Sequence, residues 1–184
     1  MTETIPYEVI GKAGEAEFRL YPPVVLATVE DDGEDSGFRL LLAYITCSNR
    51  PRNTIPMTAP VITSEQIPMT APVITSPQIP MTAPVISRPG TMSFVMPPGR
   101  TRDDIPEPTD ERVRIEEVQA REVAVIRFSG HAHEDDVETV AARLFKELRK
   151  ASVATRGTPF LMRYNAPYTP GFLRRNEVGV GIQR

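Results

Sequence analysis

The amino-acid sequence predicts an α+β protein in which a mainly antiparallel sheet or barrel carries two helices on its outer side. Several segments alternate apolar and polar residues, as strands with one buried face do. Two other segments have the apolar spacing of an amphipathic helix. The order of strands, helix and strands occurs twice along the 184 residues. This repetition predicts two similar halves related by a pseudo-twofold axis.

The first unit opens with three predicted strands and continues with a helix. Residues 7–11 and 16–21 alternate, and residues 24–29 form an apolar run after two prolines. After an acidic turn, the apolar residues of the next segment fall at the i, i+3, i+4, i+7 spacing of a helix. The acidic start favours the helix dipole, so a helix is predicted over about 36–47.

The second unit repeats this order. The apolar residues between 137 and 148 form a helical stripe, which the acidic turn at 134–136 precedes. Alternation or a short apolar run predicts strands on both sides of this helix, at 92–96, 112–118, 122–128, 160–164 and 177–182.

A 12-residue repeat lies between the two units. The segment 55–63 recurs with small changes at 67–75 and 79–87, and it holds many of the 19 prolines. Within each copy Ile, Met, Ala and Val alternate as on a strand with one buried face, while the prolines lie on the other face. Proline cannot donate to a sheet ladder, so such a strand belongs at an edge, at a bulge or in a loop on the sheet. A proline-rich linker is the competing interpretation.

Composition and charge exclude several classes of protein. Hydrophobic residues make up 40% of the chain and charged residues 24%, and no apolar run has the roughly 18 residues of a membrane span. With 21 basic and 24 acidic residues, the chain has no excess positive charge for nucleic acid. One cysteine excludes an internal disulfide framework, and no secretion signal is visible, so we expect a cytoplasmic protein. We expect one domain over 1–184, with the repeat at 55–90 as a hairpin or loop extension.

Few residues point to chemistry by themselves. His131 and His133, with the carboxylates that follow, are a candidate metal site, but a solvated turn that caps the second helix explains them better. Cys47 is a candidate nucleophile or a buried, inert thiol. The methionines of the repeat are soft metal ligands or core residues, at Met57, Met69 and Met81. The sequence contains no phosphate-binding glycine motif and no nucleophile elbow, so no motif supports an enzyme.

Six motifs in a fixed order carry a resemblance to a known family. Met-Thr-Ala-Pro-Val at 57–61 occurs again at 69–73 and 81–85, and the other five motifs lie at 94–97, 105–110, 123–130, 163–167 and 174–178. From about residue 7 to residue 182 the chain resembles the SOUL heme-binding protein family. The resemblance implies a distorted antiparallel β-barrel flanked by two helices, similar to bacterial effector-binding domains. It also implies heme or another tetrapyrrole in an open apolar cleft, without a demonstrated reaction.

The resemblance places this cleft beside the first helix and the loop before the last strand. On the matching positions the helix offers Arg39, Leu42, Ala43 and Thr46, and the loop offers Tyr168 and Phe172. Arg39 is the cation of the helix and the expected partner of a propionate. No histidine precedes residue 131, so heme is expected without a strong axial ligand from the protein. The Arg174–Arg175 pair either contacts the ligand or positions the last strand by pairing with carboxylates.

Three functions follow from these observations. The leading hypothesis is non-enzymatic binding or carriage of heme or another tetrapyrrole. The alternative is a sensor-type module that binds other bulky apolar molecules, as effector-binding domains do. A third interpretation is an enzyme, with hydrolase-like activity in the same cleft, that uses Glu177 or Tyr168 as an acid or base. No nucleic acid and no membrane span are expected as partners, and the sequence leaves the oligomeric state open.

Overall fold

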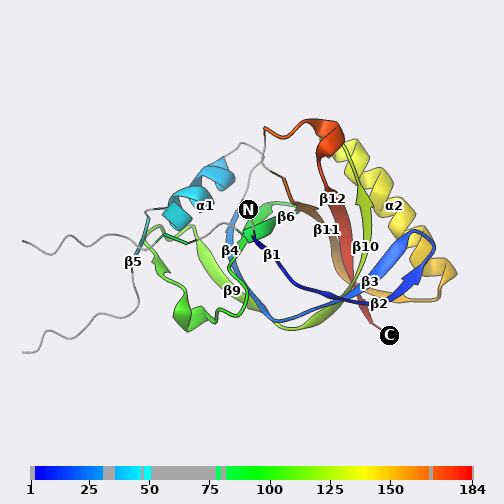
Figure 1. Ribbon diagram of the computed structural model, residues 1–184, viewed down its shortest axis with the longest axis horizontal. Helices are drawn as coiled ribbons and strands as arrows, with labels where there is room; N and C mark the ends of the chain where they lie inside the picture. Colours follow the sequence, from blue (N-terminus) through cyan, green and yellow to red (C-terminus); the bar gives the residue numbers. More distant parts are fainter. Residues whose placement is uncertain are drawn as a thin grey trace, which may run out of the picture.

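A large antiparallel sheet, curved around a concave face, carries one helix near each end of its outer side in the computed structural model (Figure 1). The structure describes residues 3–30, 36–46, 48–50, 78–79, 82–165 and 168–183. The elements of the first half are β1 (Glu3–Thr4), β2 (Glu8–Ala13), β3 (Ala16–Tyr21), β4 (Val24–Glu30), α1 (Ser36–Thr46), β5 (Asn49–Arg50), β6 (Thr82–Arg88) and β7 (Thr91–Val95). Those of the second half are η1 (Arg102–Asp104), β8 (Glu107–Pro108), β9 (Arg114–Val118), β10 (Arg121–Phe128), α2 (Glu134–Lys150), β11 (Ala154–Arg163), η2 (Gly171–Leu173) and β12 (Asn176–Gln183).

The strand order of the sheet is β2-β3-β10-β12-β11-β6-β7-β4-β9, and β1 pairs with β6 in parallel. The two units lie on opposite sides of the β6–β11 pair. The two units are arranged in the same way. In the first, β7 lies between β6 and β4, the strand that precedes α1. In the second, β12 lies between β11 and β10, the strand that precedes α2. The boundary between the units therefore follows β7, whereas the sequence placed 92–96 in the second unit. Each half also gives a strand to the other, because β3 of the first half pairs with β10 and β9 of the second half pairs with β4.

The predicted barrel is wrong, because the sheet is open. The strand path ends at β2 and β9, and no pairing joins these two strands in the described part of the chain. Both strands expose charged side chains, among them Glu8 and Lys12 on β2 and Arg114 on β9. Charges on an edge strand disfavour pairing with a further strand, and a barrel needs that pairing to close.

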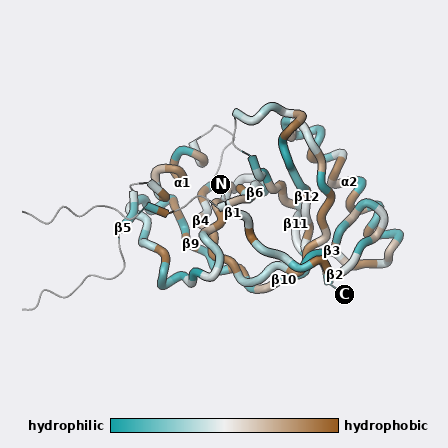
Figure 2. The backbone as a smooth tube through the Cα atoms, viewed as in Figure 1, coloured by the Kyte–Doolittle hydropathy of each residue, from teal (hydrophilic) through white to brown (hydrophobic). Residues whose placement is uncertain are grey.

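The predicted helices and most predicted strands agree with the structure. α1 begins at Ser36 as predicted, and α2 extends three residues beyond the apolar stripe at its N-terminal end. Alternate residues of the strands face opposite sides, which is why hydrophobic and hydrophilic stretches alternate along the chain (Figure 2). The two-residue strands β1, β5 and β8 are too short to have a periodic signal and were not predicted.

Three apolar clusters hold the sheet and helices together. One lies between α2 and the outer face of β3, β10, β11 and β12, and the second lies between α1 and the outer face of β4 and β7. The third cluster covers the concave face, where Leu26, Val95, Val123, Val125 and Met162 are almost fully buried. The sheet is therefore buried on both faces along its central strands, and burial of this apolar area is the main force that holds the curve.

The third copy of the repeat forms β6 inside the sheet rather than at an edge, since β6 lies between β7 and β11. The pairing of β6 with β7 shifts register between Thr82 and Val85, and the pairing with β11 begins at Val85. Pro84 lies in this interruption, so its missing N–H leaves no gap in a regular ladder. The predicted bulge is therefore present. The first two copies, at 55–63 and 67–75, lie outside the described residues.

Candidate functional site

A cleft of about 540 Å³ lies between α1 and the chain that joins β11 to β12, and we name it the α1 cleft. One part of its lining is apolar and comes from α1, β6 and β7: Phe38, Leu42, Val85 and Met92. The remaining lining is polar: Arg39, His131, Arg163, Asn165, Arg174 and Asn176. This division gives the α1 cleft one surface for an apolar body and another for anionic groups.

The helical period of α1 divides its side chains between the core and the cleft. Leu41, Tyr44 and Ile45 are buried against the sheet, while Leu42 is 37% exposed. Phe38 links the two sides, because its ring contacts the ring of Phe94 edge-on at a centroid distance of 5.4 Å. The apolar lining is therefore continuous with the core under α1, which fixes its position.

Two further arginines join Arg39 at the α1 cleft, and neighbouring groups orient both of them. The Arg163 side chain donates from Nη1 to Oγ of Ser87 on β6, at 2.8 Å. The Arg174 side chain donates from Nε to the carbonyl oxygen of Thr169, at 2.6 Å. Guanidinium groups held in this way suit carboxylate or phosphate oxygens, because their donors are already positioned.

The structure brings two of the predicted site residues together and places four elsewhere. Arg39 and Leu42 line the α1 cleft. Ala43 and Thr46 follow them on α1 but do not line it; the Thr46 hydroxyl donates to the carbonyl oxygen of Leu42 at 2.8 Å. The two loop residues also lie outside the lining, since Tyr168 is 90% exposed and Phe172 is 80% exposed.

Sequence reasoning named part of the polar lining. The Arg174–Arg175 pair is a predicted ligand contact or strand-positioning pair, and the structure places Arg174 in the lining. Arg163 begins a motif but was not singled out, and neither were Asn165 and Asn176. His131 is predicted only as a metal candidate or as part of a turn that caps the second helix. That turn reaches the cleft because Gly130 N–H donates to the Gly171 carbonyl at 3.1 Å and Asn176 donates to the Gly130 carbonyl at 2.9 Å.

The residues proposed as metal ligands do not form a metal site in the part of the chain that the structure describes. No cluster of three or more His, Cys, Asp or Glu side chains that could hold a metal ion occurs there. The rings of His131 and His133 stack with centroids 5.8 Å apart. His133 is the N-cap of α2, and its N–H donates to the Asp136 carboxylate at 3.3 Å. Cys47, Met57, Met69 and Met81 lie outside the described residues.

The concave face holds a buried ionic network around Glu177, whose side chain is not exposed at all. Its carboxylate accepts hydrogen bonds from Arg19 at 2.6 Å, from Arg175 at 2.7 Å and from the Tyr164 hydroxyl at 2.8 Å. Burial alone would raise the pKa of Glu177, but the hydrogen bond and charge of Arg19, together with hydrogen bonds from Arg175 and Tyr164, lower the pKa overall. Glu177 therefore stays ionised.

This network lies on the face opposite to the α1 cleft. Asn176 lines the cleft, and the next residue of β12, Glu177, points to the concave face, as successive strand residues do. Burial raises the pKa of Tyr164 strongly, and the negative charge of Glu177 adds to the rise. A carboxylate with a lowered pKa and three donors is a structural anion rather than a poised acid or base.

The amino-acid sequence matches the model of the SOUL heme-binding protein family over residues 2–66 and 63–181. The chain therefore belongs to the SOUL heme-binding protein family. The two matched segments overlap at residues 63–66, inside the repeat region. A comparison with curated proteins gave no match.

Solved structures share the fold at low sequence identity. A hydrolase from Listeria innocua is 12% identical, with 95% of this chain and 94% of that chain covered and a TM-score of 0.56. A second crystal structure of a Listeria innocua hydrolase is 11% identical with the same coverage and TM-score. The EcmrR C-terminal domain is 9% identical, with coverages of 97% and 98% and a TM-score of 0.54. In the described residues, neither helix is both long and apolar enough to cross a membrane.

Proposed function

We propose that this protein binds heme or another tetrapyrrole in the α1 cleft and catalyses no reaction on it. The observation that carries this proposal is the division of the cleft between an apolar part and three arginines. A tetrapyrrole needs an apolar surface for its macrocycle and cations for its propionates. Membership of the SOUL heme-binding protein family supports the same ligand class.

Each part of the lining has a role in this proposal. Phe38, Leu42, Val85 and Met92 contact the macrocycle. Arg39, Arg163 and Arg174 pair with the propionates. Arg39 contributes chiefly charge, whereas Arg163 and Arg174 are oriented by Ser87 and Thr169. The bound iron would supply its own ligand and redox chemistry, and the protein residues supply binding and orientation.

The proposal includes no strong axial ligand from the protein. His131 borders the cleft, but its Nε2 atom faces Gly171, where an added Cβ would lie only 2.6 Å from that nitrogen. The backbone of Gly171 therefore lies beside Nε2, where an iron bound to this nitrogen would need space. Four residues outside the lining form a rim that a ligand larger than the lined part of the cleft would contact: Ala43, Thr46, Tyr168 and Phe172.

The second candidate function is a sensor-type module for another bulky apolar molecule. The observation that favours this class is the lining of the α1 cleft, which can hold other organic anions by the same contacts. In either case the ligand acts as a bound molecule and not as a substrate. For both functions we propose a cytoplasmic protein with one domain and no nucleic-acid partner.

Titration of the purified protein with hemin, followed by absorbance, tests the proposal. We expect a saturable one-to-one change, and we expect Arg39→Glu to weaken hemin binding about tenfold or more because the charge at the propionates is reversed. The matched control is Arg100→Glu, which changes an exposed arginine outside the cleft and should leave the affinity as it is. Absence of saturation, or equal affinity for both variants, would overturn tetrapyrrole binding at this site.

A further inference from the structure

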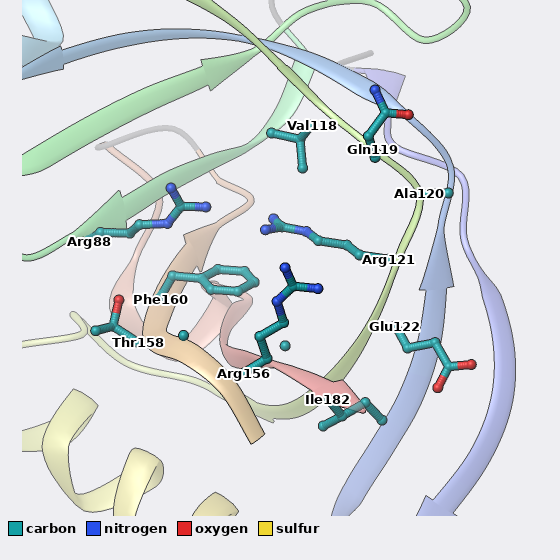
Figure 3. Close-up of a pocket in the computed structure, with 12 residues that line it drawn as sticks. Arg88, Val118, Gln119, Ala120, Arg121, Glu122, Arg156, Thr158, Phe160 and Ile182 are labelled. Atoms are coloured by element: carbon teal, nitrogen blue, oxygen red, sulfur yellow. The ribbon is translucent and has the colours of Figure 1, made fainter. Parts of the chain in front are cut away.

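A second cavity, of about 620 Å³, opens on the concave face and shares no lining residue with the α1 cleft. Three arginines from three strands line it, and we name it the arginine pocket: Arg88 at the end of β6, Arg121 at the start of β10 and Arg156 on β11. Figure 3 shows their guanidinium groups pointing toward one another beside the ring of Phe160. Residues far apart in sequence thus place three positive charges in one cavity.

These charges have no counterions within the described residues, where none of the three guanidinium groups forms an ion pair. Glu122 also lines the pocket, but its carboxylate points away from the arginines (Figure 3). Burial lowers the pKa of Arg121, and the charge of Arg88 lowers it further. The arrangement leaves positive charge in a partly desolvated place, where an anion would be held strongly.

The ring of Phe160 fixes two of the three arginines. The guanidinium carbon of Arg121 lies 5.1 Å from its centroid, and that of Arg88 lies 5.7 Å from it. Both distances fall in the range of cation–π contacts, which hold the charged groups in place without neutralising them. The donors of both groups therefore remain for a ligand.

The backbone of β11 and β12 is shaped to make this space. Arg156 pairs with Gly181 and Phe160 pairs with Gly179, so β11 has two extra residues between pairs that are two residues apart on β12. Arg156 and Phe160 lie opposite residues that share a face of β12, so both lie on that face, and the bulge brings them closer along the strand than a regular ladder would. Gly181 is needed, because a Cβ there would lie 2.8 Å from the Arg156 carbonyl oxygen.

An apolar surface adjoins the charges. A small cavity of about 20 Å³ shares Arg121 and Phe160 with the arginine pocket and is otherwise lined mainly by apolar core residues of the concave face, such as Val24, Ile86 and Met162. Val118 and Ile182 add apolar area to the arginine pocket itself. A bare inorganic anion would use the guanidinium groups and leave this surface in contact with water.

We propose that the arginine pocket is a second binding site, which takes a small aromatic carboxylate: the carboxylate accepts hydrogen bonds from the arginines, and the ring packs beside Phe160. Guanidinium groups suit carboxylates through their paired donors and suit aromatic rings through their flat faces. The volume falls within the range of small-molecule sites. This site is independent of the tetrapyrrole proposal.

Isothermal titration calorimetry with phthalate in a phosphate-free buffer of low ionic strength tests this site. We expect saturable one-to-one binding of phthalate and none of phthalamide, its neutral diamide. Arg121→Gln should weaken binding about tenfold or more, because a charge-assisted hydrogen bond is lost. Arg156→Gln is the second variant, since Arg156 is exposed and its replacement leaves the core intact. Arg100→Gln, at an exposed arginine that lines neither cavity, is the matched control and should bind phthalate as the wild type does.

Three results would overturn the proposal. The first is no saturable binding of phthalate by protein that still unfolds cooperatively. The second is unchanged affinity in both Arg121→Gln and Arg156→Gln. The third is inorganic phosphate binding as tightly as phthalate, which would show that the aromatic body contributes nothing. Loss of hemin binding in the separate titration would leave this result unaffected.

Discussion

Arg19 and Glu177 form a bidentate ion pair across a strand that belongs to neither of them. Nη1 of Arg19 lies 2.6 Å from Oε2 of Glu177, and Nη2 lies 3.2 Å from Oε1. Arg19 is on β3 and Glu177 is on β12, and β10 lies between these strands. The pair therefore ties three strands on the concave face in addition to their backbone ladders.

Glu177→Gln should destabilise the protein by about 3–5 kcal/mol at pH 7, the range expected when one partner of a buried ion pair is removed. The guanidinium groups of Arg19 and Arg175 would then face a neutral amide in a buried site. Urea denaturation, with the midpoint and slope both fitted, measures the change. Glu138→Gln replaces an exposed glutamate of α2 and should change the free energy of unfolding by less than about 0.5 kcal/mol. Equal effects of the two substitutions would contradict the role of the network.

The contribution of Glu177 should depend on pH in one direction. Its pKa is lowered in the folded protein relative to the ordinary value of 4.5. A group of this kind binds protons more readily in the unfolded state, so its stabilisation is complete above about pH 5 and decreases as the pH falls through the ordinary range and below. The difference in free energy of unfolding between wild type and Glu177→Gln should therefore shrink between pH 5 and pH 3. A constant difference over this interval would show that Glu177 is not ionised in the folded protein.

His131→Ala should leave the Soret maximum of the hemin complex where it is in the wild type. The Nε2 atom of His131 faces Gly171, so we expect no bond from this nitrogen to iron. The absorbance spectrum of each saturated complex measures the effect. A shifted maximum in His131→Ala, with no shift in the neighbouring His133→Ala, would identify His131 as an axial ligand.

Gly181→Ala should destabilise the protein by about 1–3 kcal/mol, as overpacking does. The new Cβ would lie 2.8 Å from the carbonyl oxygen of Arg156, and backbone cannot move aside easily. Gly179→Ala, on the same strand and face, is the matched comparison. Its Cβ would meet only side chains, at 3.1–3.2 Å, so we expect a smaller loss in thermal or urea unfolding. A larger loss in Gly179→Ala would show that the bulge at Arg156 tolerates more than the geometry indicates.

Deletion of 67–78, one period of the repeat, should leave a folded protein with a similar melting temperature. The deletion joins Gln66 to Ile79 and so preserves the glutamine that precedes the third copy. We propose that the second copy extends a loop, because β6 uses residues of the third copy and the family matches in two separate segments that meet inside the repeat. Circular dichroism during heating measures the transition. Loss of cooperative unfolding would instead make the second copy part of the sheet.

Periodicity predicted the helices and the long strands, because burial of one face imposes a period on the sequence. It did not predict an open sheet. Closure depends on whether β2 and β9 pair, and the periodicity of a strand shows which face is buried but not which distant strand lies beside it. The α1 cleft was predicted in part: the helix residues Arg39 and Leu42 were found, but His131 reaches the cleft through a turn. The arginine pocket had no signal at all. Arg88, Arg121 and Arg156 lie on separate strands, and only strand order and a bulge unite them.

The exchange of β3 and β9 makes the two halves of the molecule dependent on each other. Without the second half, β3 would keep β2 as its partner but lose β10, and β4 would keep β7 but lose β9. A fragment that contains one half therefore has strands whose hydrogen-bonding partners lie in the missing half. We therefore expect the halves to unfold in a single transition, and separately produced halves to acquire structure only when mixed.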